Sequence, residues 1–389
     1  MSRGSVLVKH LSIIFCLLLA FGCQNKEEKA AAVAKSENEI LIGAVFAMTG
    51  PIASYGQESV NGIKMALDEV NKTPINGKTI KLLVEDNKGE PVESANAVRK
   101  LIDINKVDLV LGSVASSNTL ASSPIAQAAK VPLLTPASTN EKVTMTGDYI
   151  FRTCFTDNFQ GVVMAKFAFN TLNKRKAAII VDNSSDYSKG LQKVFKEEFG
   201  TLGGAVIQDN FTYTQKDTDF RSLLTKVKRA NPDVIFLPGY YSEVGLILKQ
   251  ARQMGMDMPI LGGDGWDSPK LQELAGPQGI KGNYISSHFS PDDADPKVQK
   301  FVKDYMERFN EKPGAMAALG FDAMLVVADA IKRAGSNNAA DIQKALATTV
   351  AFEGVTGSIT IDANRNAQKS AVVLETTATG NVFNQKVSP

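Results

Sequence analysis

The sequence predicts an α/β fold made of two doubly wound lobes. Short apolar runs recur between residues 40 and 261, and helical patterns separate most of them. Polar residues stand only at the flanks of these runs, as parallel strands covered on both faces require. The alternation of strand and helix is too long for one sheet, so a second sheet is expected.

Each element follows from this pattern in chain order. Strands are predicted at residues 40–46, 79–84, 107–112, 131–135, 177–181, 234–237 and 259–261, and helices at 58–70, 91–104 and 219–230. Residues 149–153 interrupt the series, which begins again near Gly161. Three further helices are predicted at 296–310, 315–334 and 340–348, before a terminal strand pair at 357–361 and 372–374. The chain is therefore expected to cross between two lobes more than once.

The first 22 residues are predicted to be a targeting segment. Arg3 and Lys9 precede an apolar stretch at residues 11–22, which is shorter than the roughly 20 residues that span a membrane. This pattern is typical of a secretory signal. Cys23 and the three residues before it resemble a bacterial lipobox, in which the cysteine is acylated and the chain is cut before it. The alternative is an ordinary cleaved signal followed by a chance cysteine.

Charge and composition limit the possible partners. Residues 23–38 are rich in Lys, Glu, Ala and Ser without apolar periodicity, which predicts a flexible tether. The chain has 43 basic and 41 acidic residues, and the leader, which contains no acidic residue, holds the excess as Arg3 and Lys9. A balanced body argues against nucleic acid, which needs a clustered basic face. It suits a small or zwitterionic partner.

The sequence offers little for catalysis. Cys154 is the only cysteine of the body, so we expect no disulfide there and a small buried apolar side chain. His288 is the only histidine past the leader, and it is interpreted as structural. There is no nucleophile elbow, and no His or Cys pair has the spacing of metal ligands. We therefore expect neither an enzyme nor a cofactor or metal.

Polar residues follow several of the predicted strands. In open α/β sheets, ligands bind at the carboxyl ends of the strands. Two neighbouring strand ends continue into the hydroxyl-rich segments 113–119 and 136–140, which suit a carboxylate or simply cap helices. In the second lobe Asp264 follows a strand and could pair with an ammonium group or serve as a turn residue. Tyr187 would add an amphipathic side chain to the wall of this predicted site.

The ordered motifs resemble the periplasmic leucine/isoleucine/valine-binding protein family, of the type I periplasmic binding protein fold. They are Ile42-Gly43 to Thr49-Gly50-Pro51 with Tyr55-Gly56, Glu85-Asp86-Asn87, Gly112 to Thr119, Thr135-Pro136-Ala137, Tyr187, Gly239-Tyr240-Tyr241 and Phe352 to Gly357. The resemblance covers residues 40 to about 382. It implies a substrate-binding protein that delivers a small amino acid to the permease subunits of an ABC importer.

The resemblance also implies roles for individual residues. Ser116, the backbone of Ala137 and Thr139, and the Thr139 hydroxyl would hold the ligand carboxylate. Asp264 would hold the ammonium group. Aromatic positions lining the cleft are Tyr55, Tyr187 and Tyr240, and Val114 and Ala115 would line the side-chain pocket. Trp266 departs from the family pattern and could intrude on that pocket.

The implied lobes are residues 39–157 with 288–363 and residues 158–287 with 364–389, joined by three hinge crossings. We expect an exported monomer, held to a membrane only through its lipid anchor, that binds a branched-chain or other small apolar amino acid. Alternatives are another ligand on the same fold (an aromatic or γ-amino acid, an amide or a carboxylate), a sensory ligand-binding subunit, or an enzyme on a doubly wound fold.

Overall fold

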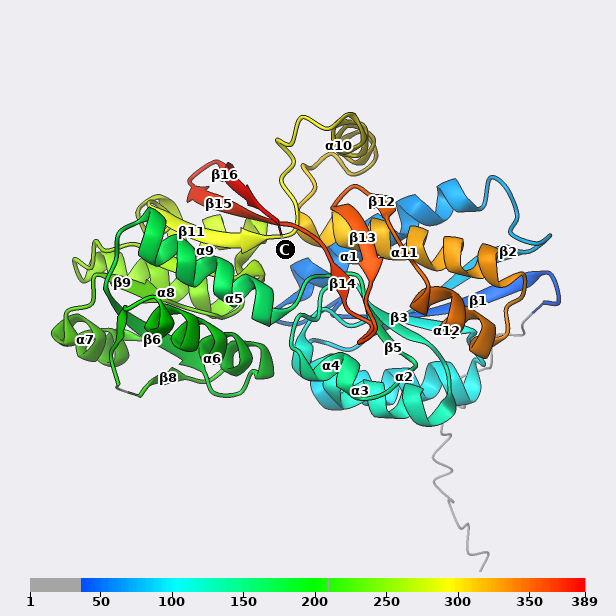
Figure 1. Ribbon diagram of the computed structural model, residues 1–389, viewed down its shortest axis with the longest axis horizontal. Coiled ribbons are helices and arrows are strands. Elements are labelled where there is room, and N and C mark those ends of the chain that lie inside the picture. The colour runs from blue at the N-terminus through cyan, green and yellow to red at the C-terminus, as the bar shows by residue number, and fades with distance from the viewer. Residues whose placement is uncertain (1–35, 209, 389) are drawn as a thin grey trace, which may run out of the picture. The chain divides into compact units, whose positions relative to one another are not determined.

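The computed structural model describes residues 36–208 and 210–388. These residues contain two large sheets and a small third one. Figure 1 shows the two large sheets in separate regions of the molecule, each with its own helices. The predicted α/β fold with two sheets is confirmed. The predicted leader, Cys23 and most of the tether lie outside the described residues.

The first sheet has five parallel strands in the order β2-β1-β3-β4-β5. They are β1 (Glu39–Phe46), β2 (Thr79–Asp86), β3 (Leu109–Gly112), β4 (Leu133–Thr135) and β5 (Ile150–Arg152). The prediction that residues 149–153 interrupt the series is wrong. Ile150 and Phe151 pair with Leu133 and Leu134 as the edge strand of this sheet, and both are fully buried.

Six helices are packed around the first sheet. They are α1 (Ala53–Val70), α2 (Pro91–Arg99), α3 (Ser116–Ala129), α4 (Lys142–Met145), α11 (Ala315–Ala334) and α12 (Ala339–Ala347). Helices α1 and α11 approach each other closely because both carry glycine at the contact. A side chain at Gly62 would overlap the backbone of Ala317, and one at Gly320 would overlap the backbone of Ser59. This packing holds the first turns of α11 beside the middle of α1.

The second sheet has eight strands and is mixed. The order is β16-β15-β11-β10-β9-β6-β7, with β8 also paired to β6. Its strands are β6 (Lys176–Asp182), β7 (Ala205–Val206), β8 (Phe211–Tyr213), β9 (Val234–Phe236), β10 (Ile260–Gly262), β11 (Asn283–Ser287), β15 (Ala371–Thr377) and β16 (Gly380–Val387). Its helices are α5 (Asp157–Lys166), α6 (Asp186–Thr201), α7 (Arg221–Ala230), α8 (Tyr241–Gln253) and α9 (Pro269–Gly279). Strand β15 is antiparallel to both of its neighbours.

The predicted terminal strand pair does not form. Strand β13 (Gly357–Ile361) pairs with β12 (Phe352–Gly354) and β14 (Ala367–Gln368), whereas β15 joins the second sheet. The chain passes between the two large sheets after β5, after β11 and after β14. Helix α10 (Pro296–Phe309) lies on the second of these passages. The lobe boundaries given above stay a prediction.

None of the helices within the described residues is both long and apolar enough to cross a membrane.

Candidate functional site

A cavity lies among the ends of elements from both large sheets. It is lined by Tyr55, Val114, Ser116, Ala137, Thr139, Tyr187, Tyr240, Asp264, Gly265 and Met316. All seven residues predicted to bind the ligand are in this set. The cavity lies at the carboxyl ends of β3, β4 and β10, where ligands bind in open α/β sheets.

Hydroxyl and backbone groups form one side of the cavity. Ser116 begins α3 directly after β3, and the first N–H groups of a helix lack a partner within the helix. The backbone N–H of Asn140 donates to Ser116 Oγ at 3.2 Å, and Ser138 Oγ donates to the Val114 carbonyl at 2.8 Å. These bonds tie together the two loops that carry Ser116 and Thr139. This side offers uncharged hydrogen-bond donors, which suit a carboxylate.

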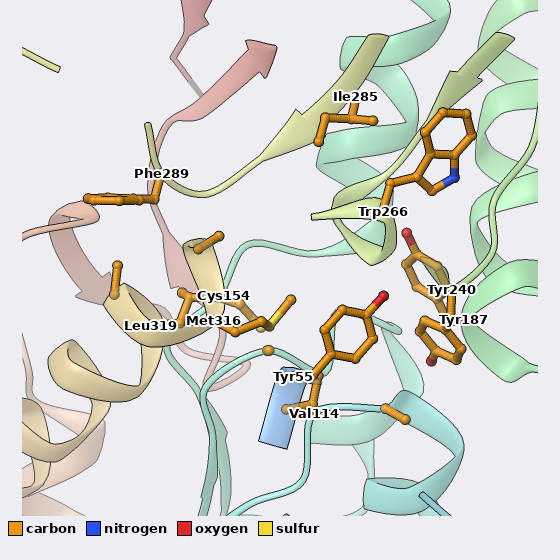
Figure 2. Packing of buried hydrophobic residues seen from close by; sticks show 14 of the residues in the cluster. Tyr55, Val114, Cys154, Tyr187, Tyr240, Trp266, Ile285, Phe289, Met316 and Leu319 are labelled. Carbon is orange, nitrogen blue, oxygen red and sulfur yellow. The ribbon is translucent and has the colours of Figure 1, made fainter. Parts of the chain in front are cut away.

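Three tyrosines also line the cavity. The rings of Tyr187 and Tyr240 stack at 5.3 Å, and Tyr55 meets Tyr240 edge to face at 6.0 Å. Figure 2 shows Tyr55 pointing toward this pair, with Val114 beside its base. The Tyr55 hydroxyl donates to the carbonyl of Gly265, and the N–H of Gly265 donates to Tyr187 Oη at 3.1 Å. Burial raises the pKa of all three phenols, so they stay neutral.

Asp264 forms the acidic side of the cavity. It begins the short η3 helix (Asp264–Trp266) after β10 and is 3% exposed. Gln160 Nε2 donates to Asp264 Oδ1 at 3.0 Å, and His288 Nε2 lies 3.1 Å from Asp264 Oδ2. The Gln160 side chain also accepts from the backbone N–H of Asp264 at 3.2 Å. The carboxylate is therefore held in place on both oxygens at the edge of the cavity.

A second buried carboxyl group lies behind Asp264. Gln160 Nε2 also donates to Asp157 Oδ1 at 2.9 Å, so one amide joins the two acidic residues. Asp157 Oδ2 has no hydrogen-bond partner among the described residues. Burial, with the nearby charge of Asp264, raises the pKa of Asp157 to about 7. Asp157 can thus take up or lose a proton near neutral pH.

Sequence reasoning missed several residues of this site. Asp157 and Gln160 lie in the first turns of α5, where an acidic residue is ordinary. His288 was interpreted as structural, yet its side chain contacts Asp264. Met316 lies on the apolar helix α11, where nothing in the pattern separates it from a core residue. Only the single histidine of the body was a usable signal.

Trp266 does not enter the cavity. Its indole Nε1 donates to the carbonyl of Leu237 at 2.9 Å, and its side chain is fully buried against Gly262. Figure 2 shows the indole directed away from Tyr187 and Tyr240. The expectation that Trp266 intrudes on the pocket is therefore wrong.

The chain also has a second cavity beside the first. Ala115, Ser117 and Tyr240 line it together with Glu90 and Lys216. The Lys216 Nζ atom lies 2.7 Å from Glu90 Oε1, and both side chains are exposed. An ion pair thus connects the start of α2 with the segment that follows β8 at the mouth of the site.

Two further observations limit the chemistry of the described residues. Cys154 is a free, buried cysteine, as predicted, and burial raises the pKa of its thiol to about 12. Such a thiol is unreactive. Within residues 36–208 and 210–388, no three His, Cys, Asp or Glu side chains are grouped so that they could hold a metal ion.

Comparison with known structures shows that the chain is similar to several solute-binding proteins. A leucine-binding protein of Thermotoga maritima is 39% identical with a TM-score of 0.87, covering 90% of this chain and 99% of that one. A branched-chain amino acid transporter substrate-binding protein of Streptococcus pneumoniae, in complex with isoleucine, is 36% identical with a TM-score of 0.85, covering 90% and 100%. A solute-binding protein of an ABC transporter from Rhodopseudomonas palustris, in complex with 3,4-dihydroxybenzoic acid, is 25% identical with a TM-score of 0.81, covering 90% and 97%.

The family comparison covers most of the chain. The sequence profile described as periplasmic binding protein matches residues 39–381. This range holds both large sheets except most of β16, together with every residue that lines the cavity. The chain belongs to the periplasmic binding protein family.

Proposed function

We propose that this chain is the extracytoplasmic substrate-binding protein of an ABC importer and that it binds a branched-chain amino acid. The observation that carries the proposal is the polarity of one cavity. Neutral hydrogen-bond donors lie on one side and the buried carboxylate of Asp264 on the other, with tyrosine rings between them. An α-amino acid carries the complementary groups, a carboxylate and an ammonium, on one carbon atom.

The proposed binding mode uses both sides of the cavity. Ser116, the Ala137 backbone and Thr139 hold the ligand carboxylate, and Asp264 holds the ammonium group. The apolar side chain of the ligand then contacts Val114, Ala115 and Met316, and the three tyrosines cover it. Similar proteins with solved structures are solute-binding proteins of transporters, which supports a binding protein rather than an enzyme.

Binding closes the protein in this proposal. Residues 39–157 with 288–363 form one lobe, and residues 158–287 with 364–389 form the other. A ligand that touches Ser116 and Asp264 at once favours the closed arrangement, because only that arrangement offers both contacts. Small-angle scattering should give a smaller radius of gyration with leucine than without. An unchanged profile at saturating leucine would count against closure.

The location of the protein follows from its leader. We propose that it is exported and anchored to a membrane by acylation of Cys23, because a short apolar stretch ends just before this cysteine. Two or more acyl chains would give stable attachment. The Cys23→Ala variant should appear in the soluble fraction or stay unprocessed. Mass spectrometry of the native protein that finds an unmodified mature N-terminus would exclude the anchor.

A second candidate ligand is an aromatic carboxylate, since the similar Rhodopseudomonas protein binds 3,4-dihydroxybenzoic acid. The hydroxyl side of the cavity suits such a ligand, and the tyrosines could stack on its ring. Asp264 opposes it, because a buried carboxylate without a cationic partner is costly. The amino acid is therefore the better fit. A sensory subunit with the same cavity would bind the same ligand without contacting a permease, which a pull-down with the importer distinguishes.

A thermal-shift panel tests the proposed ligand. The panel holds all twenty common amino acids and benzoate, each at the same concentration. A ligand present at a hundred times its dissociation constant adds about 2.7 kcal/mol to the free energy of unfolding. Leucine, isoleucine or valine should raise the melting temperature most. A shift with benzoate alone would favour the second candidate, and no shift with any compound would contradict both.

A further inference from the structure

We propose that His288 is a positioning residue of the binding site: as a neutral imidazole it donates a hydrogen bond from Nε2 to Asp264 and orients that carboxylate toward the ligand ammonium. This inference rests on the proposed function and deepens it. It names the group that prepares Asp264, at a position where sequence reasoning found only a structural histidine.

The geometry surrounds Asp264 with two donors from different elements. Gln160 on α5 holds Oδ1, and His288, directly after β11, lies 3.1 Å from Oδ2. The His288 side chain is 0% exposed and that of Asp264 is 4% exposed, so water cannot take over this contact. Gln160 is itself fixed, because Ser286 Oγ donates to its Oε1 at 2.9 Å. Neither donor can move without disturbing a packed strand or helix.

The chemistry of the contact determines the tautomer of His288. A carboxylate only accepts hydrogen bonds, so a neutral imidazole must carry its proton on Nε2 to make this contact. The other ring nitrogen, Nδ1, has no hydrogen-bond partner among the described residues. The ring stacks on Phe155 with the centroids 3.6 Å apart, which fixes its plane. The contact therefore requires the Nε2–H tautomer.

Neutrality is what makes this donor useful. A lysine or arginine at the same place would also orient Asp264, but its positive charge would compete with the ligand ammonium for the carboxylate. A neutral imidazole orients the carboxylate and leaves its charge available. Burial lowers the pKa of His288, and the buried ammonium of Lys369 acts in the same direction, whereas Asp264 opposes both. The structure thus disfavours the imidazolium form.

An affinity experiment on the full chain separates positioning from packing. Leucine is compared with isocaproate, which has the same carboxylate and side chain but no ammonium group. His288→Leu should weaken leucine binding about 10-fold or more and change isocaproate binding less than about threefold, because only the ammonium depends on Asp264. His288→Gln keeps a donor and should restore part of the leucine affinity. Phe155→Leu, the matched control, removes the stacking partner and leaves the donor in place.

The outcomes are distinct. Equal losses for both ligands, or a loss in Phe155→Leu as large as in His288→Leu, would show that His288 only packs. If the parent protein binds no amino acid, the proposed function fails, and NMR still tests the inference. In the full chain with His10→Gln, His288 is the only histidine. Its ¹⁵N signals should report a neutral Nε2–H tautomer at pH 7. An Nδ1–H tautomer or an imidazolium would overturn the inference. This measurement keeps His288 in place, so it remains valid even if the His288→Leu variant fails to fold.

Discussion

The two sides of the cavity differ in charge and in how they are built. The hydroxyl side consists of loops close in sequence, with contacts such as Asn140 to Ser116 that span 24 residues. The acidic side joins Gln160 to Asp264 over 104 residues and to Ser286 over 126. The first side resembles ordinary helix starts. The second exists only because the fold brings distant segments together, and it holds the buried charge. Changes on the acidic side should therefore have the larger effects.

The largest effect is expected for Asp264→Ala. Removing one partner of a buried charged pair costs about 2–5 kcal/mol, or roughly 30-fold or more in affinity. Leucine binding should nearly disappear. Isothermal titration measures the affinity, and circular dichroism checks the fold. Affinity equal to that of the parent would make Asp264 only a turn residue.

Ser116→Ala should have a smaller effect on the opposite side. A hydrogen bond from a hydroxyl to a charged group contributes about 1.5–3 kcal/mol, and the N–H groups of the loop remain to hold the carboxylate. The expected loss in leucine affinity is therefore smaller than for Asp264→Ala in the same titration. The reverse order would refute the assignment of the two sides.

The pH dependence of stability should also come from buried carboxyl groups, among them Asp157, whose pKa is raised to about 7. Burial raises the pKa of Glu58 to about 8 and that of Asp267 to about 6. A carboxyl group whose pKa is raised in the folded state binds its proton more tightly there than in the unfolded chain. For Glu58, the stabilising contribution is present in full below the pKa of the unfolded chain, near 4.5. It is lost as the pH rises through the folded-state pKa of about 8. The stability of the ligand-free protein should therefore fall between these two values.

Glu58→Gln tests this dependence. The rise from 4.5 to about 8 corresponds to at most about 5 kcal/mol, and relaxation of the site should reduce the effect to about 2 kcal/mol. The variant should be more stable than the parent at pH 8.5 and should show a flatter decline from pH 5, as measured by urea unfolding. Ser116→Ala is the control and should keep the slope of the parent. A Glu58→Gln curve parallel to that of the parent would contradict the assignment.

The smallest effect is expected at the mouth of the site. Lys216→Ala breaks the exposed ion pair with Glu90. Exposed pairs contribute little and are screened by salt, so leucine affinity should change less than about threefold. The change should vanish in high salt. A loss that persists in 1 M salt would mean that this pair is part of the binding machinery.

The difference between local and long-range contacts also explains how much could be predicted from the sequence. The strand–helix alternation and the hydroxyl loops at residues 113–119 and 136–140 follow from local patterns, and the structure places them as expected. The resemblance placed Asp264 and the tyrosines in the site. Gln160 carries no such pattern, because its contacts to Asp264 and Ser286 join elements that are distant in sequence. The partner of His288 is only 24 residues away, but no local pattern marks the pair.

Two errors in the fold have physical causes of the same kind. Residues 150–152 form the edge strand β5, which follows β4 after only the four-residue helix α4, so the strand–helix alternation did not mark it. Segments 357–361 and 372–374 both form strands, but the crossing between β14 and β15 sends them to different sheets. Strand propensity is local, whereas the choice of partner strand is not.

The most direct test of the account is the binding of leucine and of two analogues that each lack one charged group. Isocaproate lacks the ammonium group, and isoamylamine lacks the carboxylate. The account predicts that the parent binds leucine at least about 30-fold more tightly than either analogue. Asp264→Ala should remove the preference for leucine over isocaproate and leave the preference for leucine over isoamylamine. Ser116→Ala should reduce the preference for leucine over isoamylamine and leave the other. If both variants lower both preferences equally, or if the parent binds isocaproate as tightly as leucine, the two sides do not hold the two ends of an amino acid.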